Sequence, residues 1–377
     1  MRAHAAPGAL PPFRVTDALT RDEIRALLPA SNPRGLAAVA STWAGIAIAF
    51  AAVAVWPSPG VVVAAVVFIG ARQLALGILM HEAAHRTLLV PRRLNDFVGE
   101  WLCAKPIWSD LAGYRDSHLR HHRFNGTPTD PDLPIVSQFP TTPAGLVMCF
   151  LRDLLGVTAM FRLAVTLLVD FGFLAFSASG EGTPLDQRSR STWQVVHAGA
   201  RSLSRVAIPH LAIFGVLWAA GHPGLYLLWW VAWATTMQAF FRIRAMLDHA
   251  CTPDAGDPLR NSRTTGARLW ERLTVSPHRV NYHLEHHLLM TVPFFNLPRL
   301  HALLRDRGAL AQACVDRGSL TVLARAAAGS GTPPAESSPG APRPPPPPAY
   351  LRRDHASLVA YLGGEVTRRA ILMRRGP

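Results

Sequence analysis

The stretch VVVAAVVFIGARQLALGILMHEAAH, residues 61–85, joins a long apolar run to two histidines. The run from Val61 to Met80 is long enough to cross the ~30 Å hydrocarbon core of a bilayer as a helix that rises about 1.5 Å per residue. His81 and His85 follow it directly, and positions i and i+4 of a helix lie on one face. The stretch therefore predicts a transmembrane helix whose end carries two metal ligands.

A second apolar run precedes this one. Leu36 to Trp56 contains no charged side chain, and the turn sequence Pro57–Gly60 connects it to the next run. We expect a transmembrane hairpin rather than a cleaved signal peptide, because the polar residues 1–35 precede it without a small-residue cleavage site. Arg72 and Gln73 interrupt the second helix, and they fit either a helix–helix contact or a functional cavity.

Two later segments, Val206–Gly221 and Pro223–Phe241, predict another hairpin. The segment Val157–Phe176 is also apolar, but it carries Arg162 and Asp170. A crossing there would place the histidine clusters described below on opposite sides of the membrane, so we expect an interfacial or re-entrant segment. The predicted fold is an all-α integral membrane protein with four transmembrane helices in two hairpins, interfacial helices and a cytosolic, histidine-rich cap.

The composition agrees with a membrane location. Of the 377 residues, 49% are hydrophobic and only 16% are charged, below the roughly 25% of ordinary soluble domains. The net charge of +14 comes from arginine, because Lys105 is the only lysine. The apolar content excludes a disordered chain, and the four dispersed cysteines exclude a disulfide scaffold. No nucleic-acid-binding motif is present, so we expect arginines at an anionic membrane surface and no nucleic-acid partner.

The distribution of arginine predicts the orientation. The turns at 57–60 and 221–224 contain no lysine or arginine, whereas the amino-terminal region, residues 86–123 and the residues after Arg242 are rich in arginine. By the positive-inside rule, both termini and the histidine clusters lie on the cytoplasmic side. High arginine and alanine usage favours a bacterial source, so we expect a multi-pass protein of a bacterial cytoplasmic membrane.

The chain divides into four segments by composition. Residues 1–35 form a cytosolic amino-terminal segment, in which Thr20-Arg-Asp-Glu23 predicts a capped helix, and residues 36–310 form the membrane domain. Residues 311–349 read as a linker that becomes proline-rich from about residue 326. The basic residues 350–377 form a tail that fits either an amphipathic surface helix or a loosely ordered segment.

Histidines carry the strongest functional signal in the sequence. Three clusters follow the apolar hairpins: HEAAH at 81–85, HLRHH at 118–122 and HLEHH at 283–287. In the second and third clusters we expect a helix to place positions i and i+3 on one face with i+4 beside them, so that three imidazoles converge. The clustered histidines are His81, His85, His118, His121, His122, His283, His286 and His287.

These eight histidines exceed what one metal uses, because a catalytic zinc takes three protein ligands and a water molecule. The site is therefore expected to hold two metals. His249 directly follows the fourth predicted crossing, in Arg244-Ala-Met-Leu-Asp-His249, and so emerges on the same side as the clusters. A lone histidine at a helix end is commonly a polar cap, but this shared side makes His249 a ninth candidate ligand.

The ordered set of clusters resembles the three histidine boxes of the membrane fatty acid desaturase family. The resemblance covers roughly residues 20–310 and extends to RHHRFNGTPTDPD at 120–132 and NYHLEHHL at 281–288. In that family such boxes supply the ligands of a non-haem di-iron centre on the cytosolic face. A further histidine before the last box completes the set, and by position this is His249. The resemblance implies two iron ions, O2 as co-substrate and a fatty acyl substrate in a lipid or thioester.

This chemistry suits the residues present. Removing hydrogen from an unactivated methylene needs a strong oxidant, which reduced iron with O2 provides and a side chain does not. Imidazole is a suitable iron ligand, and a shell of neutral histidines leaves the metal charge uncompensated. The chain differs from some family members in having no fused cytochrome b5 domain, and box three begins with His283 instead of glutamine. We therefore expect a separate electron donor, of the ferredoxin or cytochrome b5 type with its reductase.

Carboxylates beside the boxes are candidates for orienting the ligands. A metal-bound imidazole commonly donates its other N–H to a carboxylate or carbonyl. Arg242 and Arg244, at the end of the fourth predicted crossing, are candidates for binding an anionic head group, although positive-inside anchoring explains them equally. The candidate partners of the ligands are Glu82, Asp116, Asp130, Asp132, Asp248, Asn281 and Glu285.

Three alternatives stay open. A di-iron hydroxylase, or a carotenoid- or sphingolipid-type oxygenase, would share the metal site and yield an oxygenated product. An intramembrane zinc metalloprotease would use His81, Glu82 and His85, the H-E-x-x-H pattern, but it leaves the other clustered histidines unexplained. A non-enzymatic metal-binding membrane protein is the third. Desaturation accounts for the whole set and is the predicted function.

Overall fold

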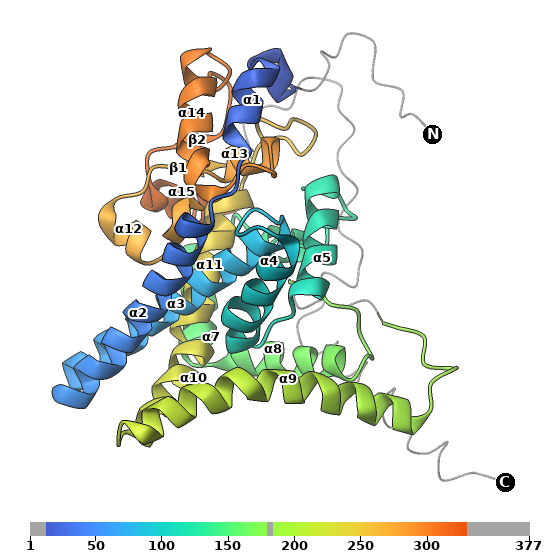
Figure 1. The fold of residues 1–377 in the computed structure, drawn as a ribbon. Helices are drawn as coiled ribbons and strands as arrows, with labels where there is room; N and C mark the ends of the chain where they lie inside the picture. Colours follow the sequence, from blue (N-terminus) through green and yellow to red (C-terminus); the bar gives the residue numbers. More distant parts are fainter. Residues whose placement is uncertain (1–12, 179–183, 330–377) are drawn as a thin grey trace. The chain divides into compact units, whose positions relative to one another are not determined.

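Helices make up nearly all of the secondary structure in residues 13–178 and 184–329, which are the residues that this computed structural model describes. These residues belong to one compact unit (Figure 1). The only strands within them, β1 (Thr264–Thr265) and β2 (Val315–Asp316), pair in parallel. The expected basic tail at 350–377 and the proline run before it lie outside the described residues.

The first predicted hairpin consists of α2 (Asn32–Val55) and α3 (Pro59–Ala84). Both helices are long and apolar enough to cross a membrane. Ser58 caps α3 by accepting a hydrogen bond from the Val61 amide. Because α3 continues without interruption to Ala84, it carries His81 beyond its apolar part.

Arg72 and Gln73 of α3 make contacts between elements. Gln73 donates a hydrogen bond to the Trp229 carbonyl over 2.9 Å, and Arg72 donates one to the Leu273 carbonyl. Neither side chain lines the cavity described below. Of the two interpretations left open by the sequence, the structure supports the helix contact.

The second predicted hairpin is more irregular. α9 (Thr192–Ala219) is a third helix that is long and apolar enough to span a membrane. The chain then enters α10 (Tyr226–Ala234) and α11 (Thr236–His249), which are separated by a break at Thr235. The crossing expected at 223–241 is therefore divided between two shorter helices, and it stays a prediction that together they span the membrane.

The break between α10 and α11 is fixed by contacts with α3. Thr236 donates a hydrogen bond to the Val66 carbonyl over 2.9 Å. A Cβ atom at Gly70 would lie 2.1 Å from the Thr236 hydroxyl, so only glycine fits there. In Figure 1 the α2–α3 turn and the α9–α10 turn both lie at the lower left, away from α5 (Leu111–Phe124) and α13 (His283–Leu288).

The segment expected to be interfacial or re-entrant forms part of a bent pair. α7 (Pro143–Leu154) and α8 (Val157–Asp170) meet at 63° around Gly156, whose φ of +79° favours glycine. A broken span and a re-entrant loop share this geometry. The described residues thus contain three helices able to span a membrane, or four if this pair counts as one.

Short elements cover the histidine-bearing ends of the long helices. They include α1 (Arg21–Leu27), whose predicted Thr20–Glu23 capping box is present. An apolar cluster joins α1 to the chain after box three, through residues such as Leu27, Val292 and Leu300. Further short α-helices of this part are α4 (Arg92–Val98), α6 (Leu133–Val136), α12 (Leu269–Leu273), α14 (Leu297–Asp306) and α15 (Ser319–Ala326).

Part of the segment expected to be a linker is folded. Residues 315–326 form β2 and α15, and the Ala326 carbonyl accepts a hydrogen bond from the Thr141 amide over 2.7 Å. Val322 of α15 is fully buried. The prediction from 311 onward failed here because packing against other parts of the chain stabilises a segment whose own sequence signal is weak.

Candidate metal centre

Five imidazoles from three elements converge at the end of α3. Their ligand-capable nitrogens all lie within 4.8 Å of one another. Nε2 of His122 is 3.0 Å from Nε2 of His118 and 3.0 Å from Nε2 of His286. The members of this five-histidine group are His81, His85, His118, His122 and His286.

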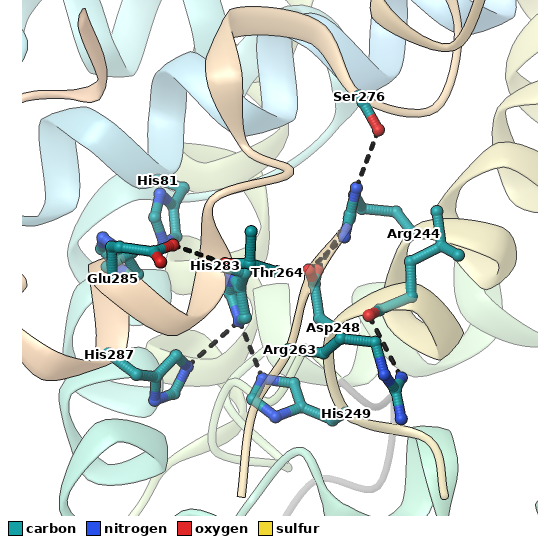
Figure 2. Close-up of polar contacts among 12 residues, drawn as sticks. His81, Arg244, Asp248, His249, Arg263, Thr264, Ser276, His283, Glu285 and His287 are labelled. Carbon is teal, nitrogen blue, oxygen red and sulfur yellow. Dashed lines mark hydrogen bonds and ion pairs between the residues drawn. The ribbon is translucent and has the colours of Figure 1, made fainter. Parts of the chain in front are cut away.

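Four further imidazoles converge beside them. Nε2 of His283 lies 2.8 Å from Nε2 of His249 and 3.1 Å from Nε2 of His287 (Figure 2). The two groups are adjacent, because the rings of His122 and His287 stack with centroids 4.2 Å apart. The members of this four-histidine group are His121, His249, His283 and His287.

The structure divides the boxes differently from the sequence prediction. In box two, His118 and His122 belong to the five-histidine group, whereas His121 belongs to the other. In box three, His283 and His287 belong to the four-histidine group, whereas His286 belongs to the other. Positions i and i+4 therefore share a group and i+3 does not, because the side chains at i+3 and i+4 point about 100° apart around the helix and reach different, adjacent groups.

The arrangement fits two metal ions. Two nitrogens bound at about 2.1 Å to one metal, at roughly a right angle, lie about 3 Å apart, as these Nε2 pairs do. Several buried ring nitrogens also lack a hydrogen-bond partner among the described residues, including Nε2 of His81 and of His85. Buried polar atoms normally have a partner, and a bound cation would supply it.

The electrostatic surroundings favour the neutral, ligand form of most of these imidazoles. Burial lowers the pKa of seven of them well below the ordinary value, namely His85, His118, His122, His249, His283, His286 and His287. His121 differs: burial acts to lower its pKa, but the hydrogen bond to Asp130 and the nearby carboxylates outweigh burial and raise it.

Polar partners hold the four-histidine group from outside. Asp130 Oδ1 lies 2.8 Å from Nδ1 of His121, and the amides of Gly126 and Asp132 donate to the Asp130 carboxylate. The backbone carbonyl of Asn261 lies 3.2 Å from Nδ1 of His249. These contacts leave Nε2 of each ring as the metal-facing nitrogen.

Two more aspartates lie near this group. Asp248 Oδ1 is 3.6 Å from Nδ1 of His283, and Arg244 holds the Asp248 carboxylate through a two-point hydrogen-bonded ion pair (Figure 2). Asp132 lies 3.9 Å from Nδ1 of His121. Burial raises the pKa of Asp132 to about 6, while His121 acts to lower it.

The five-histidine group has few such partners. Glu82 Oε1 lies 3.6 Å from Nδ1 of His81, but the other Glu82 oxygen accepts from the Thr87 hydroxyl and the Phe294 amide. Nδ1 of His118 and Nδ1 of His286 have no hydrogen-bond partner among the described residues. Glu82 thus mainly connects α3 to the chain after box three.

Three of the other candidates serve neighbouring elements. Glu285 accepts hydrogen bonds from His301 and Thr264 instead of a clustered histidine. Figure 2 shows Glu285 with Thr264. Asn281 donates to the Thr265 carbonyl and so holds β1 beside box three. Asp116 is exposed and pairs with Arg120.

The two head-group candidates also have partners inside the protein. Arg242 forms an ion pair with Asp153, a fully buried residue of α7, and Arg244 is committed to Asp248 and Ser276. Neither guanidinium is free for an anionic head group, because buried carboxylates neutralise both. Asn261 was not predicted from the sequence, because a contact made by a backbone carbonyl leaves no signal in the residue type.

A cavity of about 270 Å³ adjoins both histidine groups. His81 and His118 line it from the five-histidine group, and His121, His249 and His283 line it from the other. Its apolar wall comes from α3, α8 and α11, with side chains that include Leu74, Ile78, Val165, Val169, Met237 and Phe241. The arrangement suits an aliphatic segment placed beside two metals.

Comparison with known proteins gives two findings. Residues 57–315, more than half of the chain, match the family model described as fatty acid desaturase. Among curated proteins, the chain is similar to a dihydrorhizobitoxine desaturase of Bradyrhizobium elkanii. The two are 26% identical over 267 residues, which cover 68% of this chain and 72% of that protein.

Proposed function

The chain belongs to the fatty acid desaturase family and is an oxidoreductase, and on this premise we propose that it introduces a cis double bond into an acyl chain with O2. The observation that carries the proposal is the pair of adjacent histidine groups beside a largely apolar cavity. The family is generally di-iron, and nine imidazoles in two groups suit two irons. Iron with O2 supplies the oxidising power that removal of hydrogen from a methylene requires.

The chain's own residues have three tasks in this proposal. The imidazoles present Nε2 atoms to the metals, Asp130 and the Asn261 carbonyl hold the rings of His121 and His249, and Asp248 lies beside the ring of His283. The apolar wall of the cavity orients the acyl chain and excludes water. Because histidines of both groups line the cavity, the reacting carbons can lie close to either metal.

The reaction needs an external reductant. One O2 accepts two hydrogen atoms from the substrate, together with two electrons and two protons, and yields two water molecules and one double bond. We propose a ferredoxin or cytochrome b5-type donor with its reductase. We also propose that the centre and both termini lie on the cytoplasmic side of a bacterial membrane, as the arginine distribution predicts.

A di-iron hydroxylase is the second candidate, because the same site serves both outcomes. In that case an oxygen atom remains in the product. The zinc protease alternative is weaker. The Glu82 carboxylate, which would act as its general base, accepts hydrogen bonds from Thr87 and Phe294, and seven histidines of the two groups would have no role.

Product analysis tests the proposal. The full-length chain would be expressed in a host with a compatible electron donor, and the host's acids and lipids would be analysed by mass spectrometry. Loss of two hydrogens from an acyl product supports desaturation, whereas gain of one oxygen identifies a hydroxylase. His286→Ala should abolish the product, and His197→Ala, which changes an exposed histidine of α9, should not.

A further inference from the structure

One cation that lines the cavity has no hydrogen-bonded counter-ion among the described residues. Arg162 of α8 lines the cavity and lies over the ring of Phe241, with its guanidinium carbon 4.3 Å from the ring centroid. Among the described residues, none forms a hydrogen bond or an ion pair with this guanidinium. The Arg162 side chain is partly exposed, and it forms part of the cavity wall.

The acidic residues nearest in the fold have other partners. Asp153 pairs with Arg242 and accepts a hydrogen bond from Thr158. Asp170, at the other end of α8, accepts hydrogen bonds from Ser202 and Trp108.

Asp132 also lines the cavity, and its Oδ2 faces His121 at 3.9 Å. It forms no ion pair with Arg162 within 4.0 Å, although the two charges attract each other over a longer distance. Arg162 is thus available to an anion that comes from outside the protein.

A purely hydrocarbon ligand would not suit the part of the cavity wall that Arg162 forms. A buried guanidinium without a partner is costly when apolar groups displace its water. A carboxylate is the natural complement, because its two oxygens match the planar fork of N–H donors. Stacking on Phe241 would hold the guanidinium plane in place for such a pair.

The position of Arg162 limits the size of the ligand. Phe241 precedes His249 by eight residues on α11, which corresponds to about 12 Å along the helix axis. Arg162 and five of the clustered histidines line the same cavity, so a carboxylate on Arg162 would lie in one ligand site with the metal centre. The cavity volume of about 270 Å³ is just below the ~300–1,000 Å³ that is typical of ligand sites.

We propose that the substrate is a compact free carboxylic acid whose carboxylate binds Arg162, rather than an acyl chain esterified to a lipid or thioester. This inference rests on the proposed function and specifies its substrate class. Esterification would remove the negative charge that Arg162 recognises, and it would attach a bulky carrier at a point inside the cavity.

Ligand binding without turnover tests this inference. Full-length, iron-loaded protein in detergent would be titrated by calorimetry with octanoate and with methyl octanoate, in the absence of O2 and reductant. We expect octanoate to bind at least tenfold more tightly than its methyl ester. Arg162→Gln should abolish that preference, and Arg152→Gln, which changes an exposed arginine of α7, should preserve it.

Arg162→Lys provides a second variant in case Arg162→Gln does not accumulate. It keeps the charge but loses the two-point geometry, so the preference for octanoate should fall at least threefold. Equal binding of acid and ester to the native protein would overturn the inference. A preference for octanoate that persists in Arg162→Gln or is undiminished in Arg162→Lys would also overturn the inference. The same holds if Arg152→Gln removes this preference as fully as Arg162→Gln does.

Two further outcomes separate this inference from the proposed function. An Arg162-dependent preference with no unsaturated product in the expression assay would reject desaturation and leave the carboxylate site standing. Unsaturated product formed from lipid esters as readily as from free acids would support desaturation and reject the carboxylate site.

If Arg162→Gln lowers the iron content and leaves the octanoate preference unchanged, the inference is wrong and Arg162 serves only to balance the charge of Asp132.

Discussion

The five-histidine group and the four-histidine group differ in what lies behind their imidazoles. In the four-histidine group, the Asp130 carboxylate and the Asn261 carbonyl lie within hydrogen-bond distance of Nδ1 of His121 and of His249. Asp248 lies 3.6 Å from Nδ1 of His283, the same distance as Glu82 from Nδ1 of His81 in the other group. In the five-histidine group, the outer nitrogens of His118 and His286 have no hydrogen-bond partner among the described residues. Outer partners orient imidazoles and raise their basicity.

From this comparison we expect the two proposed metal positions to be inequivalent. The four-histidine group has fewer ligands, but hydrogen-bond contacts with a carboxylate and a carbonyl orient two of them. The five-histidine group has one ligand more, and its imidazoles depend mainly on packing for their orientation. Substitutions in the two groups should therefore have different consequences, and the following predictions run from the largest expected effect to the smallest.

Removal of a ligand should have the largest effect. His283→Ala leaves three imidazoles in its group, and His286→Ala leaves four in the other. Loss of outer partners alone costs about 10–100-fold, so loss of a ligand should lower activity by at least ~100-fold in both variants. Metal analysis should show a greater loss of iron in His283→Ala. Equal iron content in the two variants would contradict the inequivalence of the groups.

Asp130→Asn should have the next largest effect. It replaces the carboxylate that holds Nδ1 of His121, and we expect roughly 10–100-fold weaker metal binding in the four-histidine group only. Titration of apo-protein with ferrous iron under anaerobic conditions measures both sites. Asp116→Asn, which changes an exposed carboxylate paired only with Arg120, serves as the control and should match the native protein.

Arg244→Lys should have a smaller effect on the same group. Lysine keeps the charge beside Asp248 but cannot form both bonds of the guanidinium, so Asp248 would be oriented less firmly toward His283. We expect a loss of a few-fold in activity, at most about tenfold. Arg305→Lys, in an exposed pair with Asp306, is the matched control. Unchanged activity would show that Asp248 needs no such support.

Glu82→Gln should have the smallest effect. Glutamine retains one acceptor oxygen for Thr87 and the Phe294 amide, so the expected cost is about 1 kcal/mol of stability. The five-histidine group should keep its iron. A loss of metal as large as that of Asp130→Asn would mean that Glu82 orients His81, and the contrast between the groups would disappear.

The sequence was sufficient to predict which histidines lie together but not how they divide into two groups. The apolar runs, the spacing of the boxes and the position of His249 after α11 indicated nine imidazoles on one side. His121 and His122 are adjacent on α5, so their side chains point about 100° apart and serve different groups. Which distant ring each one meets depends on how α3, α11 and α13 pack, and no local pattern specifies that.

The acidic candidates show the same limit. Asp130 and Glu285 both lie close to a box in the sequence, yet only Asp130 contacts a clustered histidine, because Glu285 faces His301 and Thr264. Likewise, α15 escaped prediction because its helix is short and Val322 is buried only by distant parts of the chain. Long apolar helices are predictable because the membrane imposes their length and composition.

Metal analysis of the native protein tests the central claim most directly. Full-length chain produced with ample iron and purified in detergent should contain about two irons per polypeptide, and Asp130→Asn should lose part of one of them while Asp116→Asn keeps both. One metal per chain in the native protein, or zinc in place of iron, would contradict a two-iron centre built from these two histidine groups.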